Sequence, residues 1–209
     1  MAIARALSLV GIPLAWLAAA QAFAATPSFS CAKPAGAAEE AICKDETLAA
    51  LDRETARLYG LARATAGLSS QRRNELVAMQ RGWIKGRNDC WKADDKASCI
   101  RDAYVIRIAE LRSGYAAARA KGGVSIGPVA VKCPDAGALA ATFVNVEPPL
   151  AYLAGGGQSL VLTIARSGSG ARYTASPRSG EASFWQKGPE ALVQLPGGKE
   201  QSCHVGPLS

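Results

Sequence analysis

The segment from residue 169 to residue 193 carries one lysine, Lys187, within a short, turn-rich and mostly uncharged stretch. An ammonium group at the end of a flexible stem can donate three hydrogen bonds. A solvated surface charge is one interpretation of such a lysine. The other is a cation shaped for an acidic cleft, with the hydroxyl of Ser169 on a neighbouring glycine-flanked loop as a second polar group.

Side chains for catalysis do not form a recognisable set. The only histidine, His204, follows Cys203 near the chain end, and no Gly-x-Ser-x-Gly motif follows a strand-like run and opens a helix. Neither a phosphate-binding loop nor a dinucleotide fingerprint occurs. Three carboxylates on an arginine-rich helix could form a glycosidase pair, but helix-surface pairing or a buried salt bridge is favoured for them: Asp45, Asp52 and Glu54. We therefore expect a binding protein, not an enzyme.

All six cysteines follow a segment that is typical of a secretory signal peptide. Residues 1–25 contain Arg5 as their only charge, then an apolar run, then alanines in a cleavage-site pattern. An even number of cysteines behind an export signal predicts disulfides, and their spacing argues against a metal site or another cofactor. The six are Cys31, Cys43, Cys90, Cys99, Cys133 and Cys203. Because the residues before Cys31 lack the pattern of a lipid-attachment site, we expect a soluble periplasmic or secreted protein.

Residues 26–120 are expected to form a disulfide-stapled three-helix hairpin or bundle. Apolar side chains recur at steps of three and four in runs that begin at Leu48, Leu76 and Ile100. The sequence GLSS at 67–70 should end the first helix and cap the second. Antiparallel packing would gather the four cysteines of this region at one end. Three pairings are possible, and we favour cross-links between the start of the first helix and the second connection.

The hydrophobic period changes after a short linker at residues 121–128. Up to eight short apolar or alternating runs, separated by Gly, Pro, Ser and Asp, predict an antiparallel barrel or sandwich over residues 129–209. The fold class is therefore α+β in two domains. Cys133 lies in the first run and Cys203 in the last. A bridge between them would close a loop of about 70 residues and contribute about 4 kcal/mol.

Positive charge is concentrated in the first half of the chain. Beyond residue 25 there are 23 Lys and Arg against 17 Asp and Glu, whereas residues 122–209 hold six basic and five acidic residues. Acidic residues are interspersed with the basic ones, which is typical of a solvated helical surface. An exported protein with this pattern is not expected to bind nucleic acid. No stretch after the signal is long and apolar enough to span a bilayer.

The second half resembles the MliC/PliC family of bacterial inhibitors of c-type lysozyme. The resemblance covers residues 129–203 and rests on SGARY at 169–173 and FWQKGPEA at 184–191, framed by Cys133 and Cys203. It implies a small antiparallel β-barrel of about eight strands, closed by a disulfide. It also implies that the serine of the Ser-Gly motif and the lysine of the Lys-Gly motif reach into the lysozyme cleft. The lysozyme-binding residues expected on this basis are Ser169, Gly170, Tyr173, Lys187 and Gly188.

The first half resembles the N-terminal domain of LprI-type proteins, which are also named for lysozyme inhibition. The matching segments are 39–59, 80–90 and 99–111. Together the two resemblances imply an exported inhibitor of c-type lysozyme. The alternative is a non-catalytic cell-envelope binding module whose helical domain contacts peptidoglycan or a protein partner.

The resemblance suggests how single side chains would act. Lysozyme places two carboxylates at the glycosidic bond, so its cleft favours an ammonium such as that of Lys187. Gly188 and Pro189 would hold the lysine on a tight turn and limit the entropy lost on binding. Tyr173 and Trp185 could add apolar contact at the rim or pack in the core.

Overall fold

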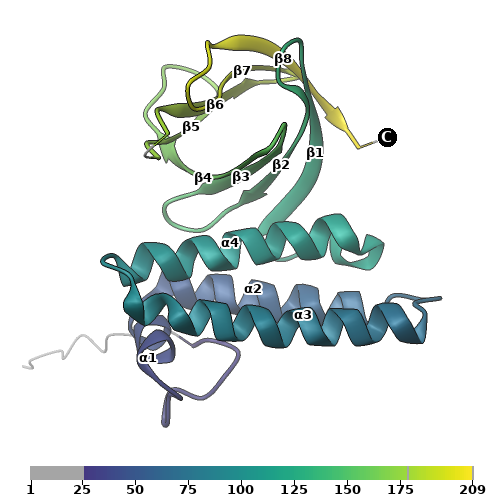
Figure 1. Ribbon diagram of the computed structural model, residues 1–209, viewed down its shortest axis with the longest axis vertical. Helices are drawn as coiled ribbons and strands as arrows, with labels where there is room; N and C mark the ends of the chain where they lie inside the picture. The colour runs from purple at the N-terminus through teal and green to yellow at the C-terminus, as the bar shows by residue number, and fades with distance from the viewer. Residues whose placement is uncertain (1–25, 178, 209) are drawn as a thin grey trace, which may run out of the picture.

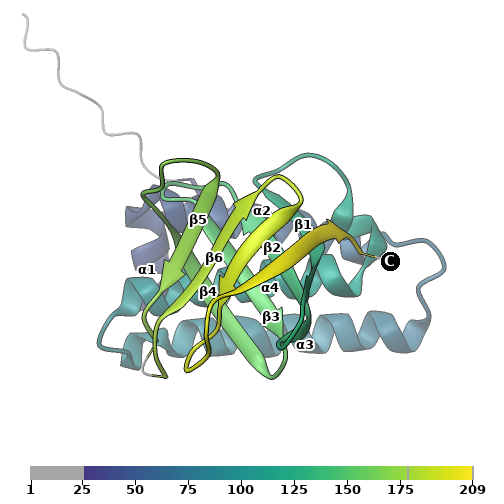
Figure 2. The same cartoon turned by 90° about the horizontal axis from the view of Figure 1, so that it is seen from above.

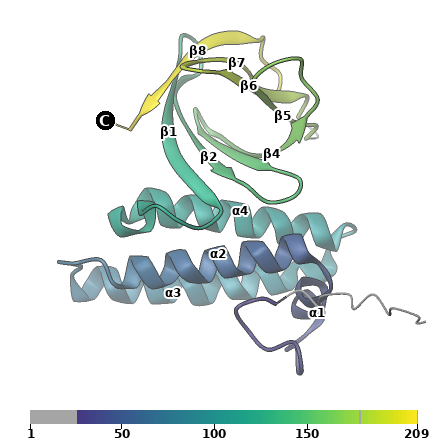
Figure 3. The ribbon, with the colours of Figure 1, turned by 180° about the vertical axis from the view of Figure 1, so that it is seen from behind.

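A layer of helices lies beneath a closed β-barrel in the computed structural model of the protein (Figure 1). The structure describes residues 26–177 and 179–208, so the predicted signal peptide lies outside it. The arrangement confirms the α+β prediction. Seen from behind, α4 (Lys96–Gly114) lies between the barrel and the other long helices (Figure 3).

The helical layer contains the three long helices that the sequence predicts. These are α2 (Glu46–Arg63), α3 (Ser70–Asn88) and α4, and the described residues add the short helix α1 (Ala37–Lys44) with the 3-10 turns η1 (Asp89–Lys92) and η2 (Ala116–Arg119). Each long helix begins at a side-chain cap, because an oxygen of Asp45, Ser69 or Asp95 accepts a hydrogen bond from a backbone N–H of the first turn. The cap at Ser69 confirms that residues 67–70 cap the second long helix, but α2 ends earlier than predicted, at Arg63.

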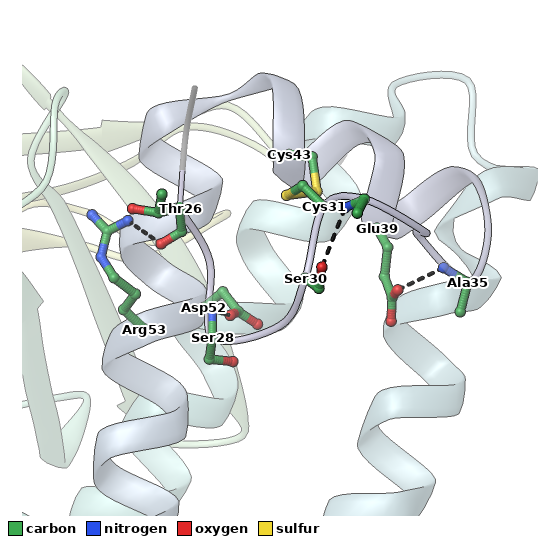
Figure 4. The surroundings of a disulfide bond; sticks show 10 residues. Thr26, Ser28, Ser30, Cys31, Ala35, Glu39, Cys43, Asp52 and Arg53 are labelled. Carbon is green, nitrogen blue, oxygen red and sulfur yellow. Dashed lines mark hydrogen bonds between the residues drawn. A yellow bond between two sulfur atoms is a disulfide. The ribbon is translucent and has the colours of Figure 1, made fainter. Parts of the chain in front are cut away.

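The disulfides of the helical layer are local, and the cross-links that we favoured from the sequence are wrong. Cys31 is bonded to Cys43, and Cys90 is bonded to Cys99. The reason lies in the segment before α1, which folds back along α2: Ser28 N–H donates to the Asp52 carboxylate (2.6 Å) and Arg53 donates to the Thr26 carbonyl (2.7 Å) (Figure 4). This path brings Cys31 against the last turn of α1 instead of the second connection.

Eight antiparallel strands close the barrel. They are β1 (Ser125–Cys133), β2 (Gly137–Val144), β3 (Leu150–Gly155), β4 (Gln158–Ala165), β5 (Ala171–Ala175), β6 (Ala182–Lys187), β7 (Glu190–Gln194) and β8 (Gln201–Pro207). Each strand pairs with the next, and β8 pairs with β1, which decides for a barrel over a sandwich. The Cys133–Cys203 bridge that the sequence suggested is present. β1 begins within residues 121–128, so the last four residues of the expected linker are strand.

The hydrophobic core of the helical layer extends to one side of the barrel and includes barrel residues. The core of the helical layer includes Val144 at the end of β2 and Leu150 at the start of β3, both fully buried, and Tyr152 and Val161 pack against it. A second core fills the barrel interior around Phe143, Phe184 and Val193. Burial of apolar surface between the two halves therefore stabilises their relative placement.

Polar and charged side chains also join the two halves. We call this group the helix–barrel junction, and it consists of Glu54, Arg57, Arg112 and Ser125. The Glu54 carboxylate accepts two hydrogen bonds from Arg57 (2.7 and 2.8 Å) and bonds from the N–H (3.2 Å) and hydroxyl of Ser125. Arg112 donates to the Gly127 carbonyl (2.8 Å) in β1. Burial by itself would raise the pKa of Glu54, but the hydrogen bonds from Arg57 and Ser125 outweigh it and the pKa is lowered.

Candidate functional site at one end of the barrel

Two loops meet at one end of the barrel, which we call the site end: residues 166–170 between β4 and β5, and residues 188–189 between β6 and β7 (Figure 2). β5 and β6 are antiparallel, with Ala171 opposite Gln186. The residues just before β5 therefore lie beside the residues at the end of β6. This pairing brings Ser169 and Lys187 together at one end, as the resemblance implies.

Gly170 allows the two loops to approach closely. Its φ is +68°, and a Cβ atom placed there would lie 2.3 Å from the Gln186 carbonyl oxygen and 2.8 Å from Cγ of Lys187. A larger residue would push the loop of Ser169 away from β6. Gly188 also has a positive φ, +61°, but a Cβ there would meet no atom within 4 Å. The backbone of the turn, not crowding, favours glycine at position 188.

Lys187 is exposed and keeps its charge available. Its Nζ lies 4.0 Å from the ring centroid of Trp185. In the part of the chain that the structure describes, no carboxylate oxygen lies within 4.0 Å of this nitrogen. Glu190 faces Lys187 across the β6–β7 pair, but its carboxylate lies 3.3 Å from Nδ1 of His204 instead. An unneutralised cation at a surface turn is suited to bind an anionic group on another molecule.

Ser169 is exposed beside this lysine. Its carbonyl oxygen accepts a hydrogen bond from Nε1–H of Trp185 (2.8 Å). The hydroxyl of Ser167 closes the same loop by donating to the Gly170 carbonyl (3.0 Å). Two hydrogen bonds therefore hold the loop, one within it and one from β6, and the Ser169 side chain lies at the surface.

Tyr173 and Trp185, for which the sequence left rim contact and core packing open, differ in their positions. Tyr173 is 6% exposed and its ring centroid lies 5.7 Å from that of Phe143, so it belongs to the barrel core. Burial raises the pKa of its hydroxyl. Trp185 is half-buried at the site end, where it contacts both Lys187 and the loop of Ser169. In the sequence, only the presence of an aromatic residue next to the Lys-Gly motif pointed to Trp185. Its contacts with Lys187 and with the loop of Ser169 could be seen only in the structure.

The three carboxylates of the glycosidase alternative have structural partners. Asp45 caps α2, and Asp52 accepts a hydrogen bond from the Tyr104 hydroxyl (2.7 Å) with Arg87 3.8 Å away. Glu54 lies in the helix–barrel junction. The interpretation as a buried salt bridge is confirmed for Asp52 and Glu54, whereas the cap made by Asp45 was not predicted. Over residues 26–177 and 179–208, no cluster of His, Cys, Asp and Glu could hold a metal ion, and no helix is long and apolar enough to cross a bilayer.

Comparison with known proteins identifies the class of the barrel. Residues 131–202, which include both loops of the site end, match the MliC family, described as membrane-bound lysozyme-inhibitor of c-type lysozyme. The protein thus joins a helical layer to a barrel that is similar to the MliC family. No solved structure gives a significant match to the chain.

Curated relatives identify the family of the whole chain. The proteins called Lipoprotein LprI of Mycobacterium bovis (strain ATCC BAA-935 / AF2122/97) and Mycobacterium tuberculosis (strain ATCC 25618 / H37Rv) are each 32% identical to it over 149 residues, which cover 70% of this chain and 70% of each relative. The chain belongs to the LprI family. The two matches together support a lysozyme-inhibitor role in general.

Proposed function

We propose that the protein is an exported inhibitor of c-type lysozyme that inserts the two loops of the site end into the active-site cleft of the enzyme. The observation that carries this proposal is the placement of Lys187, the last residue of β6, beside the loop that holds Ser169. Both side chains are exposed, and no described carboxylate pairs with the ammonium of Lys187. The mechanism is competitive occlusion without covalent chemistry.

The chemistry of the target explains why a lysine would serve. A lysozyme cleft carries two carboxylates and stabilises a positively charged transition state, so it also favours a bound ammonium. Lys187 would supply that charge, and the Ser169 hydroxyl could donate a hydrogen bond to a carboxylate or backbone carbonyl of the enzyme. The short turn at 188–189 and the tied loop at 166–170 limit the entropy that the inhibitor loses on binding.

We also propose that the protein is periplasmic or secreted and soluble after signal cleavage. The relatives are named lipoproteins, and a lipid anchor of that kind is attached through a cysteine sulfur. All six cysteines of this chain are bonded in disulfides, including Cys31, the first after the predicted signal. The disulfide at Cys31 supports release over attachment at that residue.

A turbidity assay with c-type lysozyme and bacterial cell walls tests the proposed inhibition. The parent protein should slow clearing, and the inhibition should weaken as cell-wall substrate is raised. Lys187→Ala should weaken inhibition by about 2–5 kcal/mol, because the two carboxylates of the lysozyme cleft would be buried in the complex without a cation. Equal inhibition by Lys187→Ala and the parent would show that the lysine has no such role.

The matched control is Lys199→Ala. Lys199 is also an exposed lysine on a turn, but it lies between β7 and β8, at the opposite end of the barrel. It should inhibit as the parent does. No slowing of lysozyme by the parent would favour the envelope-binding alternative, and clearing without lysozyme would indicate an enzyme.

A further inference from the structure

We infer that Trp185 is the positioning residue of the site end, which holds Lys187 and the loop of Ser169 in one arrangement before lysozyme binds. This inference rests on the proposed function. Trp185 is the residue from which both contacts arise: its ring face lies under the Lys187 ammonium at 4.0 Å, and its Nε1–H donates to the Ser169 carbonyl at 2.8 Å.

The ring contact orders the lysine without neutralising it. An ammonium over an indole face is attracted by the negative face of the ring, and tryptophan is the best ring for this contact. A salt bridge to a carboxylate would instead offset the charge that the cleft must attract. A free lysine loses much rotamer freedom when it is fixed, so a lysine already restrained by a ring loses less on binding.

The hydrogen bond orders the second loop from the same side chain. Trp185 lies in β6, opposite Arg172 of β5, and its indole reaches the loop that precedes β5. The guanidinium carbon of Arg172 also lies 5.9 Å from the ring centroid. The indole is thus held by its own strand pair, and any displacement of the ring would move Ser169 and Lys187 relative to one another.

A second tryptophan of the chain offers a matched control. Trp91 is 56% exposed in η1, and Nζ of Lys92 lies 5.5 Å from its ring centroid. This is also an exposed lysine–tryptophan pair, in the helical layer, although the Lys92 ammonium lies 2.9 Å from the Asp89 carboxylate as well. The pair lies in η1, outside the site end. Its substitution shows whether the loss of any exposed lysine–tryptophan pair weakens inhibition, or only the loss of the pair at Trp185.

A double-mutant cycle in the full-length protein tests the inference. Trp185→Leu should weaken lysozyme inhibition about tenfold, and Trp185→Phe, which keeps a ring but loses the N–H donor, about threefold. In the Lys187→Ala background, Trp185→Leu should cost at most about threefold, because its main route of action is already gone. Trp91→Leu should leave inhibition unchanged.

Three outcomes would overturn the inference. If Trp185→Leu costs the same factor in both backgrounds, Trp185 does not act through Lys187, which contradicts the inference. If Trp185→Leu and Trp185→Phe inhibit as the parent does, or if Trp91→Leu weakens inhibition equally, the ring has no positioning role. A harmless Lys187→Ala would instead refute the proposed function, so the two failures are distinguishable.

Nuclear magnetic resonance of the free protein supplies a readout that does not depend on lysozyme. The side-chain methylene protons of Lys187 should be shifted upfield by the Trp185 ring current in the parent and in the Trp91→Leu variant. The shift should disappear in Trp185→Leu, with the remaining spectrum of the barrel preserved. An unshifted Lys187 in the parent would contradict the inference even if Trp185→Leu were to fold poorly.

Discussion

The site end and the helix–barrel junction each place a cation near a serine, but they use the cation in opposite ways. At the junction, Glu54 is 3% exposed and its carboxylate is surrounded by donors from Arg57 and Ser125. At the site end, Lys187 is exposed and rests on an aromatic ring instead of a carboxylate. Charges that are buried with partners hold elements in place, whereas an exposed charge without a counter-ion remains available to another molecule.

Because one region has buried charges and the other an exposed charge, substitutions in the two regions should affect different properties. Removal of one partner of a buried ion pair leaves an uncompensated charge and is strongly destabilising. Removal of an exposed cation changes little in the free protein, because water already solvates it. We therefore expect substitutions at the junction to change the free energy of unfolding, and substitutions at the site end to change inhibition.

The largest effect on stability is expected for Glu54→Ala. Loss of this carboxylate leaves Arg57 and the Ser125 N–H without their acceptor between the helices and the barrel. The free energy of unfolding should fall by about 3–5 kcal/mol, as measured by urea unfolding. Inhibition by the fraction that stays folded should not change, and a loss of inhibition there would mean that the two regions are coupled.

The control for this change is Glu46→Ala. Glu46 also pairs with an arginine of α2, Arg53 at 2.8 Å, but its side chain is 67% exposed. Because solvent screens such a pair, the free energy of unfolding should change by no more than about 1 kcal/mol. An equal loss at Glu46 and Glu54 would contradict the role given to burial.

An intermediate effect is expected for Gly170→Ala, which should reduce both stability and inhibition. The new Cβ would clash with the Gln186 carbonyl, and the residue would keep an unfavourable left-handed backbone. We expect a loss of about 2 kcal/mol in unfolding and about tenfold in inhibition. Gly188→Ala has the same backbone penalty without the clash, so it should lose about 1 kcal/mol and retain most inhibition. Equal inhibition by the two variants would contradict the close approach of the loops.

The smallest effect is expected from pH and concerns Glu54 again. Its folded pKa lies below the ordinary 4.5, so its contribution to stability is present above about pH 4.5 and is lost as the pH falls through the folded value. Burial raises the pKa of Asp102, which acts in the opposite direction, but that side chain is 40% exposed and water weakens the effect. Urea unfolding from about pH 7 to about pH 3 should show a smaller acid loss for Glu54→Gln than for the parent. Equal acid losses would contradict a lowered pKa.

Much of the local structure could be predicted from the residues. The change from steps of three and four to alternating runs predicted where the helices end and the strands begin, because backbone period and side-chain burial are linked within each element. All eight predicted runs correspond to strands, and the cap at Ser69 lies where the sequence placed it. The Ser-Gly and Lys-Gly motifs pointed to two loops that β5–β6 pairing brings together.

The remaining features depend on contacts between distant segments. The bond between Cys31 and Cys43 follows from the contacts of Thr26 and Ser28 with α2, which no hydrophobic periodicity predicts. The buried position of Tyr173 and the surface position of Trp185 depend on how the strands face the barrel interior.

By itself, the sequence determined the class of each element and the presence of an even set of cysteines, and its family resemblance suggested the two residues of the candidate site. Only the tertiary structure decided the disulfide pairing in the helical layer, the extension of the helical core to one side of the barrel, and the position of Trp185 between Ser169 and Lys187. The physical reason is range. Periodicity and capping act over a few residues, whereas burial and cross-strand contact join residues that the chain separates.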